Sequence, residues 1–298
     1  MKPRILITGA SGYLGGHLIL QAPQNTEIFA MFHSQSSDET YGARWTAGDL
    51  LDETLPSRLL RDIKPTAVIH NAALSKPEAC DNDPDQAREL NVEATDRLAA
   101  AAASAGAKMV YVSTDMVFDG NHAPYKEDSP AHPCLLYGQT KLDGESRTLN
   151  RSKRHVAARS AVIYGGEGIF GSNFAITMIQ KWKLGESTPV FTDQYRSHVS
   201  VKWLAKTLYL LASNDFGGTI HLGGAEGTSR AEFAFGLASY LGFHTRLLTE
   251  TSFVGKLQSP RPANVIFDLS LASSIPETQP IDLATGFALE WQKNKQDL

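Results

Sequence analysis

A tyrosine and a lysine stand four residues apart in the segment L-L-Y-G-Q-T-K-L-D-G-E, which covers residues 135–145. A helix here would place Tyr137 and Lys141 on one face, about 6 Å apart along its axis. A neighbouring ammonium favours the phenolate and lowers the pKa of a tyrosine from its reference value, near ~10. Tyr137 could therefore donate a proton in a reaction near neutral pH, and the charge of Lys141 would lower the pKa of its hydroxyl group.

The place of this pair in the chain strengthens the interpretation, because the spacing also occurs on ordinary surface helices. The segment follows a strand-like run, Lys108–Ser113, and the loop S-T-D-M-V-F-D-G. Ligands bind at the carboxyl ends of strands in parallel α/β sheets. Thr114 lies at this strand end, and its hydroxyl could hold a substrate oxygen. We therefore expect Thr114, Tyr137 and Lys141 to form a catalytic group.

A glycine-rich loop near the N-terminus indicates a cofactor. In R-I-L-I-T-G-A-S-G-Y-L-G-G, glycines recur at three-residue spacing between an apolar run and a helix-like segment. Side chains there would block a tight turn and the approach of the backbone to a pyrophosphate, which the following helix N-terminus would bind. The loop predicts a dinucleotide-binding site, to which we assign Gly9, Ser11, Gly12, Tyr13, Leu14 and Gly15.

The end of the second strand-like run indicates which dinucleotide binds. The segment M-F-H-S-Q-S-S, residues 31–37, has no acidic residue, and the first one is Asp38. An acid at the strand end would hold the ribose 2′-hydroxyl of NAD and repel a 2′-phosphate. His33 and Ser34 could instead donate hydrogen bonds to a phosphate. The sequence therefore favours NADP, and NAD stays open.

Two further turns are expected in the same crevice, G-D-L (Gly48–Leu50) and N-A-A (Asn71–Ala73). The first would lie near an adenine, and the small residues of the second would let a cofactor approach closely. A helix N-cap at the aspartate and simple close packing of the alanines are the alternative explanations. From these turns and the later strand end we assign Asp49, Leu50, Asn71, Ala72, Ala73 and Ser113 to cofactor binding.

The elements that must position these residues alternate between strand and helix along the first half of the chain. This alternation predicts βαβ units and an α/β fold with a doubly wound, parallel Rossmann sheet. The strand-like runs are Arg4–Thr8, Glu27–Phe32, Thr66–His70, Lys108–Ser113 and His155–Tyr164, and the helix-like segments are Gly12–Gln21, Glu53–Asp62, Pro84–Ser104 and Leu136–Asn150.

The regular alternation of strand-like and helix-like segments ends after residue 164, where several glycines lie close together and the predicted elements become shorter. We expect helices at Val201–Ala212 and Arg230–Leu241 and a strand at Thr219–Gly224. The prediction is a Rossmann domain over residues 1–164 and a smaller C-terminal substrate-binding lobe over residues 165–298, partly interleaved with the first.

Composition narrows the function classes. The chain has 298 residues and a formal net charge of −4 without a basic stripe, which argues against nucleic acid as a partner. No apolar run reaches the roughly 18 residues of a membrane-spanning helix. The two cysteines form no C-x-x-C pair and suit a reducing compartment, and the nine histidines show no metal-binding spacing. We expect a cytoplasmic protein without a metal site.

The combination T-G-A-S-G-Y-L-G, G-D-L, H-N-A-A, S-T-D and Y-G-Q-T-K resembles the extended short-chain dehydrogenase/reductase superfamily. More narrowly, S-T-D-M-V-F-D-G, Y-G-Q-T-K-L-D-G-E, S-N-F-A-I-T-M, T-D-Q-Y and R-P-A-N resemble the dTDP-4-dehydrorhamnose reductase family. The resemblance implies hydride transfer from NADPH to a keto group of a nucleotide-linked sugar. Tyr137 would protonate the carbonyl oxygen, Lys141 would bind the nicotinamide ribose, and Thr114 would hydrogen-bond the same oxygen.

The resemblance also implies residues that contact the substrate. Arginine suits the diphosphate of a nucleotide-sugar because its planar guanidinium group can donate hydrogen bonds to two phosphate oxygens at once. Compared with the rhamnose reductases, Met116 replaces an aromatic residue and Val162 replaces a tryptophan, so the sugar stays open. The missing acid after Asp115 disfavours a dehydratase. The residues assigned to substrate binding are Asp115, Met116, Asn173, Arg196 and Arg261.

Two alternatives to the reductase stay open. A nucleotide-sugar 4-epimerase would use Tyr137 and Lys141 in both directions. The same motifs also resemble the regulatory subunit of methionine adenosyltransferase, a protein of this fold that binds NADP without an established turnover role. Members of the superfamily often pair through helices of the first lobe, so a homodimer is expected by resemblance.

Overall fold

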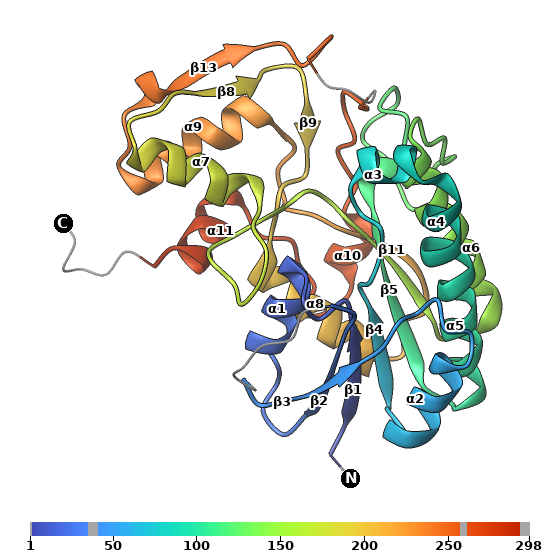
Figure 1. The fold of residues 1–298 in the computed structure, drawn as a ribbon. Coiled ribbons are helices and arrows are strands. Elements are labelled where there is room, and N and C mark those ends of the chain that lie inside the picture. Colours follow the sequence, from blue (N-terminus) through green and yellow to red (C-terminus); the bar gives the residue numbers. More distant parts are fainter. Residues whose placement is uncertain (1, 35–40, 257–260, 293–298) are drawn as a thin grey trace.

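A seven-stranded parallel sheet forms the centre of the computed structural model, which describes residues 2–34, 41–256 and 261–292 (Figure 1). Its strand order is β3-β2-β1-β4-β5-β6-β11. Their bounds are β1 Arg4–Thr8, β2 Glu27–Phe32, β3 Ala43–Ala47, β4 Ala67–His70, β5 Lys108–Thr114, β6 Val156–Ser160 and β11 Gly218–Leu222.

Helices cover both faces of this sheet. Successive residues of a strand point to opposite faces, so Ile5 and Ile7 of β1 pack in one apolar cluster and Leu6 packs in another. The first cluster includes residues of α1 and α8, and the second includes residues of α2 and α5. The covering helices are α1 Tyr13–Leu20, α8 Val201–Ser213, α2 Leu55–Ile63, α5 Ala94–Ser104 and α6 Leu136–Arg151.

The order of the strands reverses between β1 and β4, which are neighbours although β2 and β3 separate them in the sequence. A crevice for ligands opens at the carboxyl ends of the strands at such a reversal. The segments after Thr8, His70 and Thr114 all leave the sheet at this edge (Figure 1). The predicted α/β fold with a doubly wound parallel sheet is confirmed.

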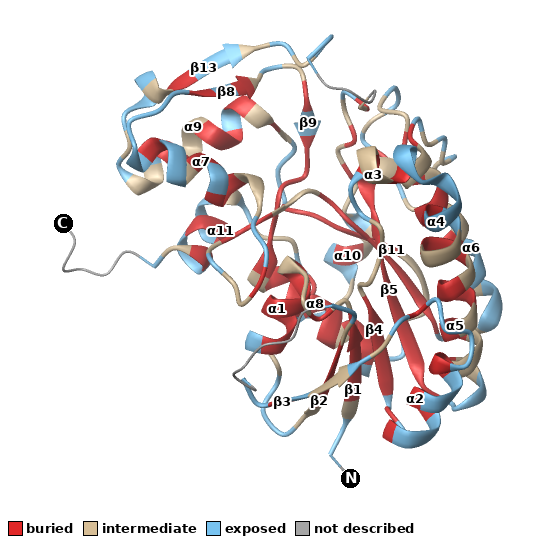
Figure 2. Ribbon diagram, in the orientation of Figure 1, coloured by how far each residue is buried: buried red, intermediate tan, exposed pale blue. Residues whose placement is uncertain are grey.

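A second apolar core lies above this edge, among elements from the later part of the chain (Figures 1 and 2). It joins buried residues such as Tyr164, Trp182, Phe233 and Phe287. The elements of this upper part are α7 Phe174–Lys183, β8 Thr188–Phe191, α9 Arg230–Leu241, β13 Leu248–Thr251 and α11 Leu283–Glu290. The short connecting elements are α3 Pro77–Asn82, α4 Pro84–Arg88, β7 Ile163–Tyr164, β9 Tyr195–Arg196, β10 Val199–Ser200, β12 Thr228–Ser229 and α10 Ser270–Ser274.

Two elements from beyond residue 164 belong to the sheet layer rather than to the upper part. Strand β11 pairs with β6 in parallel, and α8 packs against α1 and the sheet. The two parts of the structure therefore do not divide at a single point in the sequence.

Two predicted elements each span more than one element of the structure. The run Pro84–Ser104 is not one helix, because a π-helical turn, Glu89–Glu93, separates α4 from α5. The wider turn directs the Asn91 amide to the backbone of Leu74 and to the Thr140 hydroxyl. The predicted strand His155–Tyr164 ends at Ser160, and its last residues form β7, which pairs with β10 instead.

No helix in the described part of the chain combines the length and the apolar character that crossing a lipid bilayer requires.

Candidate active site

A cavity of about 1140 Å³ lies at the carboxyl edge of the sheet, with walls from both parts of the structure. Most of the residues predicted for the site line it, whereas Gly15 and Ser34 do not. The predicted residues in its wall are Gly9, Ser11, Gly12, Tyr13, Leu14, His33, Asp49, Leu50, Asn71, Ala72, Ala73, Ser113, Thr114, Asp115, Met116, Tyr137, Lys141, Asn173, Arg196 and Arg261.

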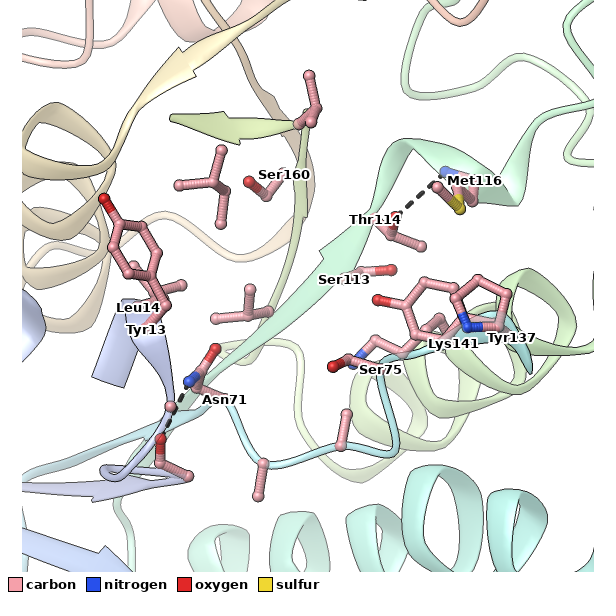
Figure 3. A pocket seen from close by; sticks show the side chains of 18 of the residues that line it. Tyr13, Leu14, Asn71, Ser75, Ser113, Thr114, Met116, Tyr137, Lys141 and Ser160 are labelled. Carbon is pink, nitrogen blue, oxygen red and sulfur yellow. Dashed lines mark hydrogen bonds between the residues drawn. The ribbon is translucent and has the colours of Figure 1, made fainter. Parts of the chain in front are cut away.

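The glycine loop lies directly against the turn that follows β4. Gly9 has a φ of 65°, and a Cβ atom there would lie 2.7 Å from the backbone nitrogen of Ala72. The Asn71 amide donates to the carbonyl oxygen of Gly9 over 3.3 Å (Figure 3). With Gly12 at the N-cap of α1, the wall of bare backbone and helix N–H groups fits a pyrophosphate.

Gly15 has a packing function in this loop. A Cβ atom on Gly15 would overlap the carbonyl oxygen of Gly9 and lie 2.7 Å from the Cα atom of Ala10. The glycine therefore lets α1 lie against the loop, and it supports the wall of the cavity from behind.

The end of the cavity where the sequence predicts the adenosine contains His33 and Asp49, whose Nε2 and Oδ2 atoms lie 3.7 Å apart. Both side chains are largely exposed. Ser34 is exposed and lies outside the cavity lining, and Asp38 lies outside the described residues. Of the two residues predicted to donate hydrogen bonds to a phosphate, only His33 lines this end of the cavity.

Close packing of α6 on β5 brings the catalytic candidates together. A Cβ atom on Gly138 would overlap the carbonyl oxygen of Met116, and one on Gly144 would overlap the Tyr111 hydroxyl. These two glycines let the helix approach the strand end, and Tyr137 immediately precedes the first of them. The segment Y-G-Q-T-K-L-D-G-E thus contains both the reactive side chains and the glycines that let α6 pack closely on β5.

Tyr137, Lys141 and Thr114 point toward the same space beside Ser113 (Figure 3). The Thr114 hydroxyl accepts a hydrogen bond from the Met116 backbone N–H over 3.2 Å, which fixes the loop after β5. Its side chain also interacts with that of Tyr137. The three predicted catalytic side chains therefore converge at one end of the cavity, with the glycine loop at the other.

The predicted lowering of the tyrosine pKa is wrong for this ligand-free structure. Burial raises the pKa of Tyr137 well above its usual value, and the interaction with Thr114 only partly opposes this effect. Burial lowers the pKa of Lys141 to about 7, against the attraction of Glu145. Desolvation is the largest cause of both shifts, because burial disfavours the charged form of each side chain. The phenol is thus protonated at neutral pH, as a proton donor must be.

The model of the RmlD substrate binding domain family matches residues 1–284 of the chain. The protein belongs to this family. The RmlD family is part of the extended short-chain dehydrogenase/reductase superfamily, so the resemblance seen in the motifs is confirmed.

Relatives of this RmlD-family chain include a subunit of methionine adenosyltransferase as well as a dTDP-4-dehydrorhamnose reductase. Methionine adenosyltransferase 2 subunit beta of Xenopus laevis is 33% identical over 277 residues, which cover 90% of this chain and 80% of the relative. The dTDP-4-dehydrorhamnose reductase of Bacillus anthracis, solved in complex with NADP, is 27% identical with a TM-score of 0.86 over 99% of each chain. MoeE5, solved with UDP-glucuronic acid and NAD, is 25% identical with a TM-score of 0.80, over 99% of this chain and 100% of that one.

The buried Lys141 ammonium of this RmlD-family protein makes its stability depend on pH. Between pH 7 and 10.5 the unfolded chain binds a proton that the folded protein has released. The lysine therefore costs stability: the penalty is full at and below pH 7 and disappears as the pH rises toward 10.5, with a limiting slope of about 1.4 kcal/mol per pH unit. We expect the stability gained by Lys141→Met to be largest near pH 7 and to shrink as the pH rises, measured by urea unfolding without ligand. A gain that does not vary with pH would contradict this prediction.

Arg196 was predicted to bind the substrate, but most N–H groups of its guanidinium already donate hydrogen bonds within the protein. The guanidinium is 3% exposed and donates to the carbonyl oxygens of Tyr195, Pro262 and Ala263 over 2.6–3.2 Å. Its Nε atom lies 3.7 Å from Oδ2 of Asp115. Arg196 thus anchors two loops of the wall, and its predicted diphosphate contact stays a prediction.

Asn173 and Arg261 also have structural partners. The Asn173 carbonyl caps α7 by accepting from the N–H groups of Ala175 and Ile176, over 2.8 and 3.2 Å. Arg261 Nη2 donates to Glu78 Oε1 over 2.6 Å, whereas its Nη1 is buried without a partner within the described residues. The predicted diphosphate contact of Arg261 therefore stays a prediction, as for Arg196.

Arg230 was not among the predicted site residues, yet it lines the cavity. Its guanidinium carbon lies 3.6 Å from the centroid of the Phe174 ring, and burial together with the charge of Arg196 lowers its pKa to about 9. No carboxylate within the described residues pairs with it. The sequence showed only the first residue of a helix, because the position over the cavity depends on distant packing.

No group of histidine, cysteine, aspartate or glutamate side chains that could hold a metal ion occurs among the residues that the structure describes. The free cysteines are Cys80, which is buried, and Cys134, which is exposed.

Proposed function

We propose that the protein is a cytoplasmic NADP(H)-dependent reductase that transfers hydride to a keto group of a nucleotide-linked sugar. The convergence of Tyr137, Lys141 and Thr114 in a cavity with the glycine loop at its other end is the observation that supports it most. The Bacillus anthracis reductase, which shares the fold over nearly its whole length, holds NADP. NAD stays possible, because MoeE5 holds that cofactor.

The residues of the chain supply binding and proton donation in this proposal. When bound, the cofactor supplies the hydride. The phenol of Tyr137 donates a proton to the carbonyl oxygen of the sugar, and the Thr114 hydroxyl hydrogen-bonds the same oxygen. Lys141 holds the nicotinamide ribose, and its charge favours the phenolate left after the transfer. Gly9, Gly12 and the N-terminus of α1 hold the pyrophosphate.

A dTDP-linked 4-keto-6-deoxyhexose is the proposed substrate class, by analogy with the rhamnose reductases. Met116 and Val162 both line the cavity, at the two positions where the motifs of those enzymes have aromatic residues. The sugar subsite is therefore less aromatic than in the reductases that the motifs resemble. A 4-epimerase would need the oxidised cofactor and the same three side chains.

The test is the loss of NADPH absorbance with a panel of nucleotide-linked sugars that carry a 4-keto group. The proposal expects turnover with at least one ketone and none with the corresponding alcohols. Interconversion of two sugar epimers with catalytic NAD, without net NADPH consumption, would favour the epimerase. No turnover on any member of the panel, despite tight NADPH binding, would contradict both enzymes.

Arg230 provides a prediction on the substrate side. A guanidinium that faces the cavity without a carboxylate partner should bind an anionic group of the substrate, such as its diphosphate. We expect Arg230→Ala to weaken the binding of UDP or dTDP by about tenfold or more, since a hydrogen bond to a charged group contributes about 1.5–3 kcal/mol. Isothermal titration calorimetry measures the effect. Arg246→Ala, an exposed arginine outside the cavity, is the control, and equal affinities for both variants would contradict the prediction.

The similarity to methionine adenosyltransferase 2 subunit beta favours a second candidate, a regulatory subunit that binds NADP. Its distinguishing test is a binding experiment with a methionine adenosyltransferase catalytic chain from the same organism. A stable complex that changes the activity of that chain, together with no ketone turnover, would support the regulatory subunit. Turnover of a ketone without complex formation would exclude it.

A further inference from the structure

A buried carboxylate lies one helical turn after the candidate catalytic lysine. Glu145 is 3% exposed and accepts hydrogen bonds from the Ser113 hydroxyl over 2.5 Å and from Arg159 Nη2 over 2.8 Å. Arg159 Nε lies 3.0 and 3.1 Å from its two oxygens, so the guanidinium binds it in a fork. These bonds join α6 to the ends of β5 and β6.

Arg159 is itself held on its far side. Its Nη1 donates to the carbonyl oxygen of Glu127 over 3.2 Å and lies 3.3 Å from Nε2 of His221. Burial, together with the charge of Arg159, lowers the pKa of His221 to about 3, so the imidazole is neutral. The Glu145 carboxylate is therefore the only charged partner of this guanidinium among the described residues.

Lys141, by contrast, has no hydrogen-bond partner for its ammonium within the described part of the chain. Lys141 is 2% exposed, and its Nζ atom lies 3.9 Å from the centroid of the Tyr111 ring. Besides that ring from β5, the titratable groups around it are Tyr137 of α6, Cys80 of α3, His70 of β4 and Glu145. Burial lowers the pKa of His70 to about 3, so this imidazole is neutral.

Among the residues that the structure describes, Glu145 is thus the one carboxylate that raises the pKa of Lys141 against the effect of burial. Residues four apart on a helix share a face, so the carboxylate and the lysine are oriented alike. The Ser113 hydroxyl, bonded to that carboxylate, belongs to the residue before Thr114. One buried group therefore contacts the strand end that holds Thr114 and influences the charge of the lysine.

We propose that Glu145 is a positioning residue of this site, which fixes the end of β5 against α6 and supplies the negative charge that the buried ammonium of Lys141 needs. A neutral amine carries no positive charge with which to favour a phenolate. The catalytic consequence rests on the proposed reductase function, whereas the charge coupling between Glu145 and Lys141 can be measured without any substrate.

The experiment measures the protonation of Lys141 directly. Protein with ¹³C at the lysine ε carbons is titrated by NMR, and the Lys141 signal is assigned by its loss in Lys141→Met. Glu145→Gln keeps the shape of the side chain and removes its charge. We expect the pKa of Lys141 in this variant to fall by about one unit, the smallest effect typical of a close opposite charge. An unchanged pKa would overturn the proposal.

Two further variants make the result specific. Asp143→Asn removes a carboxylate from the same helix that bonds Gln139 over 2.9 Å, and it should leave the pKa of Lys141 unchanged. If Glu145→Gln fails to fold because Arg159 is left unpaired, Glu145→Gln/Arg159→Gln removes both charges. The loss of the Arg159 cation opposes the loss of the carboxylate, so the double variant should lower the pKa of Lys141 by less than Glu145→Gln does, and a pKa that does not fall would overturn the proposal.

A kinetic readout separates this proposal from the proposed function. With an active ketone, Glu145→Gln should lower kcat more than it raises KM, and should move the pH profile of kcat to lower pH. A pKa shift in a protein that reduces no ketone would contradict the reductase and support the charge coupling. Turnover with an unmoved pKa and an unmoved pH profile would contradict the role of Glu145 alone.

Discussion

Tyr137→Phe is expected to lower the rate of NADPH-dependent ketone reduction by about 10²–10⁴-fold, the usual contribution of a positioned proton donor. The phenyl ring fills the same place on α6, so NADPH should bind nearly as well as before. The variant removes only the hydroxyl that points toward Thr114 and Lys141. Single-turnover absorbance and the fluorescence of bound NADPH measure the two effects separately.

A matched control is Tyr195→Phe, since that tyrosine lies on β9 and its side chain is outside the cavity lining. This variant should keep both turnover and cofactor binding. A Tyr137→Phe protein that reduces the ketone at the native rate would show that another group protonates the oxygen. Loss of NADPH binding in Tyr137→Phe would instead mean that the tyrosine holds the cofactor.

Gly15→Ala is the second substitution with a large expected effect. Its added methyl group would overlap the carbonyl oxygen of Gly9 and the backbone of Ala10, neither of which belongs to a flexible side chain. Overpacking of this kind destabilises a protein by about 1–3 kcal/mol. The loop must shift to accommodate it, so we expect a large loss of NADPH affinity as well. Urea unfolding and NADPH titration measure both.

Gly16→Ala is the control on the same helix. A Cβ atom there would lie 3.3 Å from the Cβ atom of Ile169 and 3.4 Å from the backbone nitrogens of Ile169 and Phe170, contacts that a shift of a few tenths of an ångström relieves. Helix propensity favours alanine over glycine by about 1 kcal/mol, which opposes the crowding. We expect near-native stability and cofactor binding for Gly16→Ala. Equal behaviour of the two variants would contradict the packing function of Gly15.

The sheet and the catalytic end of the site could be predicted because their signals are local. Strand β2 has the predicted bounds, Glu27–Phe32, and so does α9, Arg230–Leu241. Apolar runs between turn residues identify buried strands, and right-handed crossovers then fix their parallel order. A tyrosine and a lysine on one helix, close behind a strand end, must lie near that end whatever the rest of the chain does.

The upper part of the structure could not be predicted in this way. Strand β8, Thr188–Phe191, pairs with β13, Leu248–Thr251, and neither run has a length or pattern that distinguishes it from a loop. The same holds for the charges on this side. Arg196 is used by loop carbonyls and Arg230 faces the cavity, and both outcomes depend on contacts between distant segments.

The pKa of Tyr137 shows a third kind of limit. The spacing of Tyr137 and Lys141 identifies a cation on the same helix face, but it does not reveal how deeply the phenol is buried. Burial decides the direction of the pKa shift of Tyr137. Likewise, the fork between Glu145 and Arg159 requires β6 to lie next to β5, which only the sheet order establishes.

The most direct test of the central claim is a crystal structure of the protein with NADP⁺ bound. We predict the pyrophosphate over Gly9 and Gly12, and the nicotinamide ring beside the hydroxyl groups of Tyr137 and Thr114, with Lys141 bonded to its ribose. A cofactor bound elsewhere, or a nicotinamide ring turned away from Tyr137, would contradict the assignment of this cavity as a reductase site.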